Sequence, residues 1–351
     1  SKADANAYNR TRETIADFPL LKFQLEADEP WPDSLNPLAL RLFEDKAVLE
    51  DGTKSNPRKI YSKDPQSDGR IAGYMPLKVT LDATRHGGTR IIIEYWNKAD
   101  SHKSTLDPRR AYTEIVESLD LIESAFGTGQ GMRARTEGGS GITALGNDAE
   151  NYFLPNDIRA TVRYRNGEYL ILELVSFSQY KPLGPEDFTT ESLHTRILHN
   201  VSVTEDGEHF VDRIPMISQG DKGYCAAATI ARVLSYYGYE VDMHSVARLA
   251  ETEYYGTTRE NVIESMRRVC SSTPFRLKEL RTADYYTVKE YVDKGIPIIW
   301  LVPGHARLLI GYNPDNSDIV YSDSWGPEFA FEVMSYEECL NLNRGMFILE
   351  P

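Results

Sequence analysis

Alternation of apolar and polar residues predicts a pair of strands in the first half of the chain. Leu77, Val79 and Leu81 are separated by polar residues, and a Gly87-Gly88 turn divides them from the apolar run at 91–96. Successive side chains of a strand point to opposite faces, so this alternation is typical of a half-buried sheet. Because the turn between the two segments is short, we expect them to be antiparallel neighbours.

A helix and a hairpin are predicted next. Asp107 and Pro108 stand where an N-cap and a first-turn proline are favoured. Segments 159–165 and 168–175 flank Asn166-Gly167, the strongest short hairpin signal. The region 77–175 is therefore predicted to be a mixed α+β module. The apolar residues that give the helix its one buried face before Gly127 are Tyr112, Ile115, Leu119, Ile122 and Phe126.

The second half of the chain changes from helical to strand periodicity. One apolar helical face follows Cys225, a second helical stretch runs from 242 to 250, and a third helix is predicted at 282–294. The predicted fold class here is α+β, with a helical part followed by an antiparallel sheet. The strand-like apolar runs that predict this sheet are 296–302, 306–312 and 318–323.

Two domains are expected from the length of 351 residues and from a change in composition near the middle. Pro182, Gly184 and Pro185, followed by a polar run, predict a linker near residues 185–210. We place a separate α+β domain of unknown role at 1–205 and a second domain at 206–351. The pattern does not determine the structure of residues 1–70, which mix an amphipathic start with long polar stretches.

The charge balance narrows the choice of partner. With 53 acidic against 39 basic side chains, the net charge of −14 argues against nucleic acid or an anionic membrane surface as a general partner. A cationic peptide would suit this field better. The chain has no stretch near the ~20 consecutive apolar residues that a membrane span requires. It begins at Ser1, and if a leader was removed there, we expect a secreted or cell-envelope protein.

Three cysteines, Cys225, Cys270 and Cys339, are too few for a disulfide scaffold and lack the close pairing of a zinc site. No metal or organic cofactor is expected. If Cys225 is reactive, Cys270 and Cys339 could be bridged in an oxidising compartment or could be two buried free thiols. Both alternatives stay open.

Cys225 stands at the start of a predicted helix, where unpaired backbone N–H groups favour a thiolate. A histidine is needed to hold and deliver the proton, and His305, between two strand-like runs, is the leading candidate. Asp323 ends the next strand-like run and could orient the ring. Gln219, six residues before the cysteine, could join the Cys225 N–H in binding an oxyanion. Among the other histidines, most of which we expect to be solvated, His244 is a reserve base.

These residues resemble the papain-like cysteine peptidase superfamily, in which a glutamine precedes the cysteine at this spacing and the later motif is Asn-Ser-Trp-Gly. Here that motif is Asp323-Ser324-Trp325-Gly326. The Ala226-Ala227-Ala228 helix start and the Ser235-Tyr236-Tyr237-Gly238 helix end look most like the C39-like branch, which is related to bacterial leader-peptide peptidases. The resemblance covers about 214–349 and says nothing about the first half.

The resemblance implies a cysteine peptidase that acts on a peptide or protein substrate through a thioester. Gln219 would be the oxyanion donor, Cys225 the nucleophile, His305 the general base and acid, and Asp323 the orienting residue. Trp325 would shield the contact between His305 and Asp323 from water. An alanine follows the cysteine where papain has an aromatic residue, so the substrate pocket of papain should not be copied.

Two other functions remain open from the sequence. A Cys, His and Asp set also serves transglutaminases and amide hydrolases, which transfer an acyl group to a different acceptor. The same cleft could also belong to a catalytically inactive module that captures peptides. For the first domain, we expect that it docks the substrate or occludes the cleft.

Overall fold

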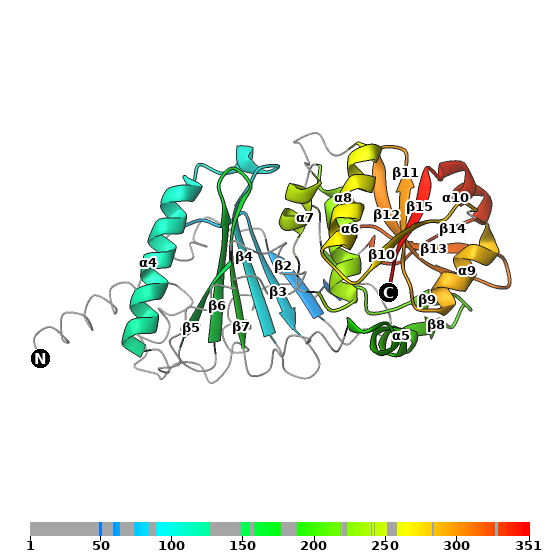
Figure 1. Ribbon diagram of the computed structural model, residues 1–351, viewed down its shortest axis with the longest axis horizontal. Coiled ribbons are helices and arrows are strands. Elements are labelled where there is room, and N and C mark those ends of the chain that lie inside the picture. Colours follow the sequence, from blue (N-terminus) through cyan, green and yellow to red (C-terminus); the bar gives the residue numbers. More distant parts are fainter. Residues whose placement is uncertain are drawn as a thin grey trace, which may run out of the picture. The chain divides into compact units, whose positions relative to one another are not determined.

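The chain forms two compact units in a computed structural model (Figure 1). The first contains the described residues from 59 to 176, and the second contains those from 188 to 351. A two-residue strand, β1 (Leu49–Glu50), precedes them in the sequence. The predicted boundary near 185–210 stays a prediction. The residues that the structure describes are 49–50, 59–63, 74–83, 89–126, 149–154, 158–176, 188–217, 219, 223–239, 241, 243–250, 258–282, 284–326 and 329–351.

The first unit is an antiparallel sheet with a helix on one face. Its described strands follow the order β2 (Lys59–Lys63), β3 (Lys78–Ala83), β4 (Thr89–Asn97), β7 (Tyr169–Ser176), β6 (Ile158–Arg165) and β5 (Ala149–Leu154). The expected antiparallel pair at 77–96 is β3 and β4, and the expected hairpin is β6 and β7. Both predictions are confirmed.

Helix α4 (Pro108–Phe126) covers that sheet and confirms the predicted helix. Asp107 Oδ1 accepts hydrogen bonds from the backbone N–H groups of Arg109 and Arg110, as an N-cap should. A short 3₁₀ turn, η1 (Ser101–Lys103), lies just before it. The core between helix and sheet is apolar, and it includes Ile91, Ile93, Ala111, Ile115, Leu119, Val162, Leu170 and Leu172.

The second unit begins within the stretch that we expected to be a linker. Helix α5 (Thr190–Leu198) and strands β8 (Val201–Val203) and β9 (His209–Val211) form there. Thr189 caps the helix by accepting a hydrogen bond from Ser192 N, and Leu193 and Ile197 are buried. The polar composition of this segment hid a helix with a narrow apolar stripe.

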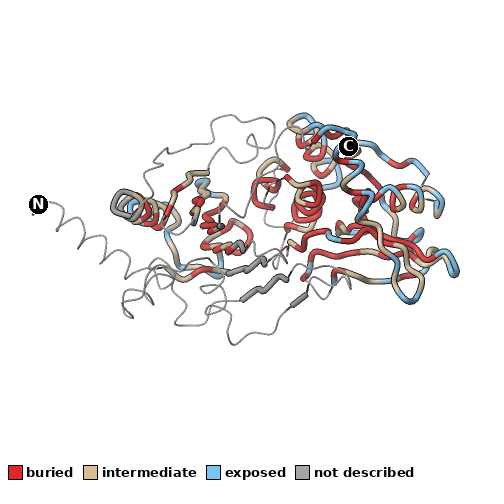
Figure 2. Tube along the Cα trace, turned by 90° about the horizontal axis from the view of Figure 1, so that it is seen from below, coloured by how far each residue is buried: buried red, intermediate tan, exposed pale blue. Residues whose placement is uncertain are grey.

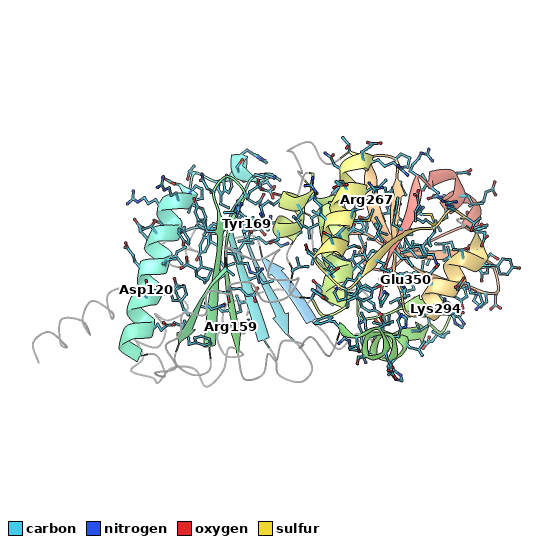
Figure 3. The ribbon with its side chains drawn as sticks, in the orientation of Figure 1. Asp120, Arg159, Tyr169, Arg267, Lys294 and Glu350 are labelled. Carbon is cyan, nitrogen blue, oxygen red and sulfur yellow. The ribbon has the colours of Figure 1, made fainter. Side chains whose placement is uncertain are left out.

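The helical part of the second unit is α6 (Cys225–Tyr236), α7 (Met243–Leu249), α8 (Arg259–Ser271) and α9 (Tyr285–Asp293), with α10 (Tyr336–Leu342) added late. Charged side chains such as Arg267 on α8 and Lys294 after α9 point away from the core (Figure 3). The described helices include none with the length and apolar character that crossing a membrane requires.

The sheet of the second unit is antiparallel, which confirms the α+β class with helices followed by a sheet. Strand β9 also pairs with β12, and most residues of the central strands are buried (Figure 2). Helix α6 packs against β12, and Thr229 on the helix donates a hydrogen bond to Ala306 O on this strand. The main strand order is β10 (Arg276–Glu279), β15 (Gly345–Glu350), β11 (Ile298–Val302), β12 (His305–Tyr312), β13 (Ile319–Ser322) and β14 (Glu332–Met334).

Gly295 ends α9 in a Schellman motif, which gives a test of the fold. Gly295 N donates to Val292 O and Ile296 N donates to Tyr291 O, while Gly295 has φ 73°. A Cβ added at Gly295 would overlap the backbone carbonyl of Ile197. Gly304 has φ 66°, but a Cβ there meets nothing within 4 Å.

We therefore expect Gly295→Ala to lower the free energy of unfolding by about 3 kcal/mol or more, because strain and overlap add. Gly304→Ala is the matched control and should cost only the left-handed strain, about 1–2 kcal/mol. Urea denaturation of the two variants measures the difference. Equal losses would mean that the contact with α5 is not formed.

Candidate active site

The pairing of β12 with β13 assembles most of the site. Leu308 pairs with Ser322 in this antiparallel register. Continued by one residue on each strand, the register sets Arg307 opposite Asp323, and two further steps set His305 opposite Trp325. Because side chains two apart on a strand share a face, His305 and Arg307 lie on the same face of β12. Four polar or aromatic groups therefore meet just beyond the end of β13.

His305 and Asp323, which were predicted as a pair, are in contact. His305 Nε2 lies 2.7 Å from Asp323 Oδ1, and the Asp323 residue is only 3% exposed. A carboxylate can only accept, so Nε2 carries the proton and Nδ1 is the ring nitrogen left to face Cys225. Ser324 N also donates to Oδ1, at 2.8 Å.

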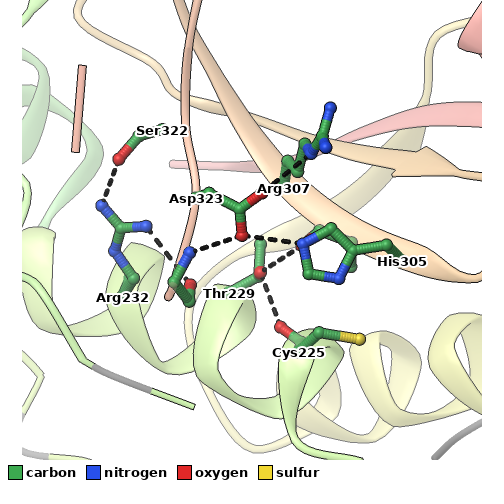
Figure 4. Close-up of polar contacts among 9 residues, drawn as sticks. Cys225, Thr229, Arg232, His305, Arg307, Ser322 and Asp323 are labelled. Carbon is green, nitrogen blue, oxygen red and sulfur yellow. Dashed lines mark hydrogen bonds and ion pairs between the residues drawn. The ribbon is translucent and has the colours of Figure 1, made fainter. Parts of the chain in front are cut away.

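Helix α6 begins at Cys225, which is partly exposed, whereas most of the following residues of the helix are buried. The preceding residue, Tyr224, makes no side-chain hydrogen bond that caps the helix. Thr229 Oγ1 donates to Cys225 O at 2.7 Å and lies 3.3 Å from Ala306 O, which ties the start of α6 to β12. In Figure 4, the Cys225 thiol and the Asp323 carboxylate lie on different sides of the His305 ring.

The His305 imidazole has a high proton affinity. Burial lowers its pKa, but hydrogen bonds with Asp323 and with the Cys225 side chain, together with electrostatic interactions with both, raise the pKa from 6.5 to about 9. The imidazolium is therefore the main form at neutral pH. A cation beside Cys225 is what a thiolate requires.

Trp325 stacks on the His305 ring, with 5.3 Å between ring centroids and 23° between the planes. It remains 48% exposed, so the other face of the indole lies toward solvent. The contact covers one face of the imidazole, as expected for a residue that keeps water from the hydrogen bond between His305 and Asp323.

Ser324 connects the two sequence motifs. Its carbonyl accepts a hydrogen bond from Gln219 N at 2.8 Å, so Gln219 lies beside the Asp-Ser-Trp-Gly segment. The Gln219 residue is 3% exposed, and within the described part of the chain its Oε1 has no hydrogen-bond partner. A buried amide oxygen without a partner is unfavourable, and an oxyanion would be bound by the amide NH₂ group rather than by this oxygen.

Arg232 also binds this segment, and it was not selected from the sequence. It lies on α6, is 1% exposed, and donates to Pro215 O, Ser322 Oγ and Ser324 Oγ. The guanidinium thus links α6, the helix that begins at Cys225, to the end of β13. A single cation within a helix that is otherwise apolar was the available signal, because a buried charge needs specific partners.

Arg307 is the second residue that sequence reasoning missed. Its Nε donates to Asp323 Oδ2 at 2.9 Å, on the side of the carboxylate away from His305. The only signal was its position two residues after His305 on a predicted strand.

The other histidine and cysteine candidates lie outside the contact between His305 and Asp323. His244, the reserve base, is not solvated, because it is 3% exposed and packs edge-on against Tyr224. Cys270 and Cys339 are free thiols, so of the two alternatives the unbridged one is observed. Among the described residues, no cluster of three or more histidines, cysteines or carboxylates could hold a metal ion.

Comparison with known proteins agrees with the resemblance to the C39-like branch that the sequence predicted for the C-terminal region. Residues 211–344 match the Peptidase_C39 like family, so this region is C39-like, as predicted. The match covers less than half of the chain and does not describe the first unit. No curated protein matches the chain.

Two solved structures resemble the chain, each with a TM-score of 0.32. One is the peptidase domain of Streptococcus ComA, a bi-functional ABC transporter involved in quorum sensing, at 20% identity over 39% of this chain and 96% of that one. The other is a protein from Bacillus anthracis assigned to the C39-like peptidases, at 13% identity over 39% of this chain and 94% of that one.

The environments of the three cysteines predict selective alkylation. Burial raises the pKa of Cys270 to about 11 and that of Cys339 to about 12, so both are protonated at pH 7. Cys225 lies beside the cationic His305 and is partly exposed. Iodoacetamide at pH 7 should therefore modify Cys225 first. Mass spectrometry of tryptic peptides measures the labelling of each cysteine. Denatured protein is the control, and equal labelling of the three thiols in folded protein would contradict the site.

Proposed function

We propose that this protein is a cysteine peptidase that hydrolyses peptide bonds through Cys225, His305 and Asp323. The observation that carries the proposal is the linked set of side chains, in which His305 Nε2 lies 2.7 Å from Asp323 Oδ1 and the Cys225 thiol lies on a different side of the same ring (Figure 4). The match of residues 211–344 to a peptidase family supports it. Nucleophile, base and orienting carboxylate then stand in the order that acyl transfer requires.

Acylation uses the ion pair of Cys225 and His305. The thiolate attacks the carbonyl carbon of the scissile bond, an Sγ–C bond forms, and the carbonyl electron pair moves to oxygen. The Cys225 N–H and the side-chain amide of Gln219 stabilise this oxyanion. When the electron pair returns, the C–N bond breaks and His305 Nδ1 gives its proton to the leaving amine.

Deacylation returns the enzyme to its starting state. A water molecule attacks the thioester carbonyl, and neutral His305 removes a proton from that water. The second oxyanion collapses, the C–S bond breaks, and Cys225 leaves as a thiolate beside the imidazolium. Asp323 holds the ring in one orientation in both half-reactions, and Trp325 covers its face against water.

The substrate class follows from the charge and from the chemistry of the site. A peptide or protein supplies the amide, and the net charge of −14 favours substrates with cationic segments. The two alternative functions would give different results in an assay. Transfer to an amine would mark a transglutaminase, and peptide capture without turnover would mark a binding module.

Removal of the nucleophile or of the base should abolish hydrolysis. We expect Cys225→Ala and His305→Ala to lose at least about 10³-fold in kcat/KM on a peptide library, because both groups act in the same step. Cys270→Ala and His194→Ala are matched controls, since His194 is exposed on α5 and Cys270 lies outside the site. Hydrolysis that persists in Cys225→Ala would refute the proposal.

The rate should fall at alkaline pH because the imidazolium is lost. The raised pKa of His305 predicts that kcat/KM declines as the pH rises through about 9. In Asp323→Asn, the negative charge that raises this pKa is absent, so the decline should move to lower pH. A pH profile from 5 to about 10.5 on one peptide measures both. An unchanged alkaline limb in Asp323→Asn would show that the carboxylate does not act on His305.

A further inference from the structure

Arg307 occupies a position that the peptidase mechanism does not use. It stands two residues after His305 on β12, and its side chain is 22% exposed. Its guanidinium lies 4.9 Å from the centre of the Tyr321 ring, on the neighbouring strand β13. The stacked ring and the Nε contact with Asp323 Oδ2 together restrict the guanidinium.

The two oxygens of Asp323 have separate partners. Oδ1 receives His305 Nε2 at 2.7 Å and Ser324 N at 2.8 Å, whereas Oδ2 receives Arg307 Nε at 2.9 Å. Rotation of the carboxylate about its terminal bond would break contacts on both oxygens. Since the residue is 3% exposed, water has little access to replace a lost donor.

We propose that Arg307 is a positioning residue, which fixes the Asp323 carboxylate so that Oδ1 stays directed at His305 Nε2. The inference deepens the proposed function and rests on it for its catalytic meaning. The contact itself is charge-assisted and directional, which makes it suited to setting an orientation.

The charged groups around His305 make the prediction specific. Cys225 faces the ring from α6, Asp323 faces it from the segment after β13, and Arg307 lies on its own strand. Arg232, also from α6, is bound to Ser322 and Ser324. Within the part of the chain that the structure describes, the hydrogen bond to the outer oxygen of Asp323, Oδ2, comes from Arg307 Nε.

Two roles of Arg307 predict opposite shifts of the His305 titration. If Arg307 acted only as a nearby positive charge, its removal would stabilise the imidazolium and move the titration to higher pH. If it positions Asp323, its removal lets the carboxylate turn away, the imidazolium loses its partner, and the titration moves to lower pH. The sign separates a positioning role from a competing charge.

The experiment compares Arg307→Met with Arg307→Lys by NMR titration of the His305 ring, assigned by its absence in His305→Ala. For Arg307→Met we expect the titration to move down by about one pH unit. We also expect kcat to fall about ten- to hundred-fold with little change in KM. Arg307→Lys keeps a cation and should recover part of both. Arg276→Met is the control, because Arg276 also lies near a carboxylate in this sheet but is 79% exposed.

A double-mutant cycle with Asp323→Asn tests whether Arg307 acts through Asp323. In the Asp323→Asn background, Arg307→Met should lower kcat no further. Additive losses, or an upward shift of the His305 titration in Arg307→Met, would overturn the inference. Circular dichroism and urea unfolding check that Arg307→Met folds, and Arg307→Lys supplies the second test if it does not.

The outcome is separable from that of the proposed function. The NMR titration reads the His305 and Asp323 contact without any substrate. A wild-type protein that hydrolyses no peptide would refute the peptidase, while the titration would still decide whether Arg307 holds Asp323. Conversely, an unshifted titration in an active enzyme would refute only the role of Arg307.

Discussion

The buried carboxylate of Asp323 is the constraint on which the site depends. An ionised carboxylate removed from water is unfavourable unless donors replace the lost hydration. Here they come from His305, Arg307 and the Ser324 N–H, while Asp323 N donates to Phe329 O. Because two of these donors lie on β12 and the carboxylate follows β13, the register between the two strands decides whether the site exists.

The same segment also fixes the position of α6, the helix that begins at Cys225. Ser324 accepts from Gln219 N through its carbonyl and from Arg232 through its hydroxyl, so the residue after Asp323 is bound to the loop before α6 and to α6 itself. Thr229 adds a contact from α6 toward β12. The distance between Cys225 and His305 is thus set by packed, buried groups, which is how a site is held ready before a substrate arrives.

The sequence predicted those parts of the fold and site that depend on local pattern. The α6 face, the α4 cap and the hairpin at Asn166-Gly167 follow from spacing and turn residues alone. Helix α8 was missed because its charged residues are as numerous as its apolar ones, although Thr258 caps it and Val262 and Met266 are buried. The roles of Arg232 and Arg307 depend on strand register and on partners distant in sequence, which no local pattern contains.

The local charge of the site differs from that of the whole chain. The net charge is −14, yet two cations, Arg232 and Arg307, lie at the segment that carries Asp323. Distant surface charge is screened beyond about 8 Å at physiological salt, so it contributes little inside a buried site. The proton affinity of His305 must therefore come from its direct contacts. The positive charge of Arg307 repels the imidazolium of His305. Its place beside Asp323 therefore favours the imidazolium only if the gain from orienting the carboxylate is larger than this repulsion.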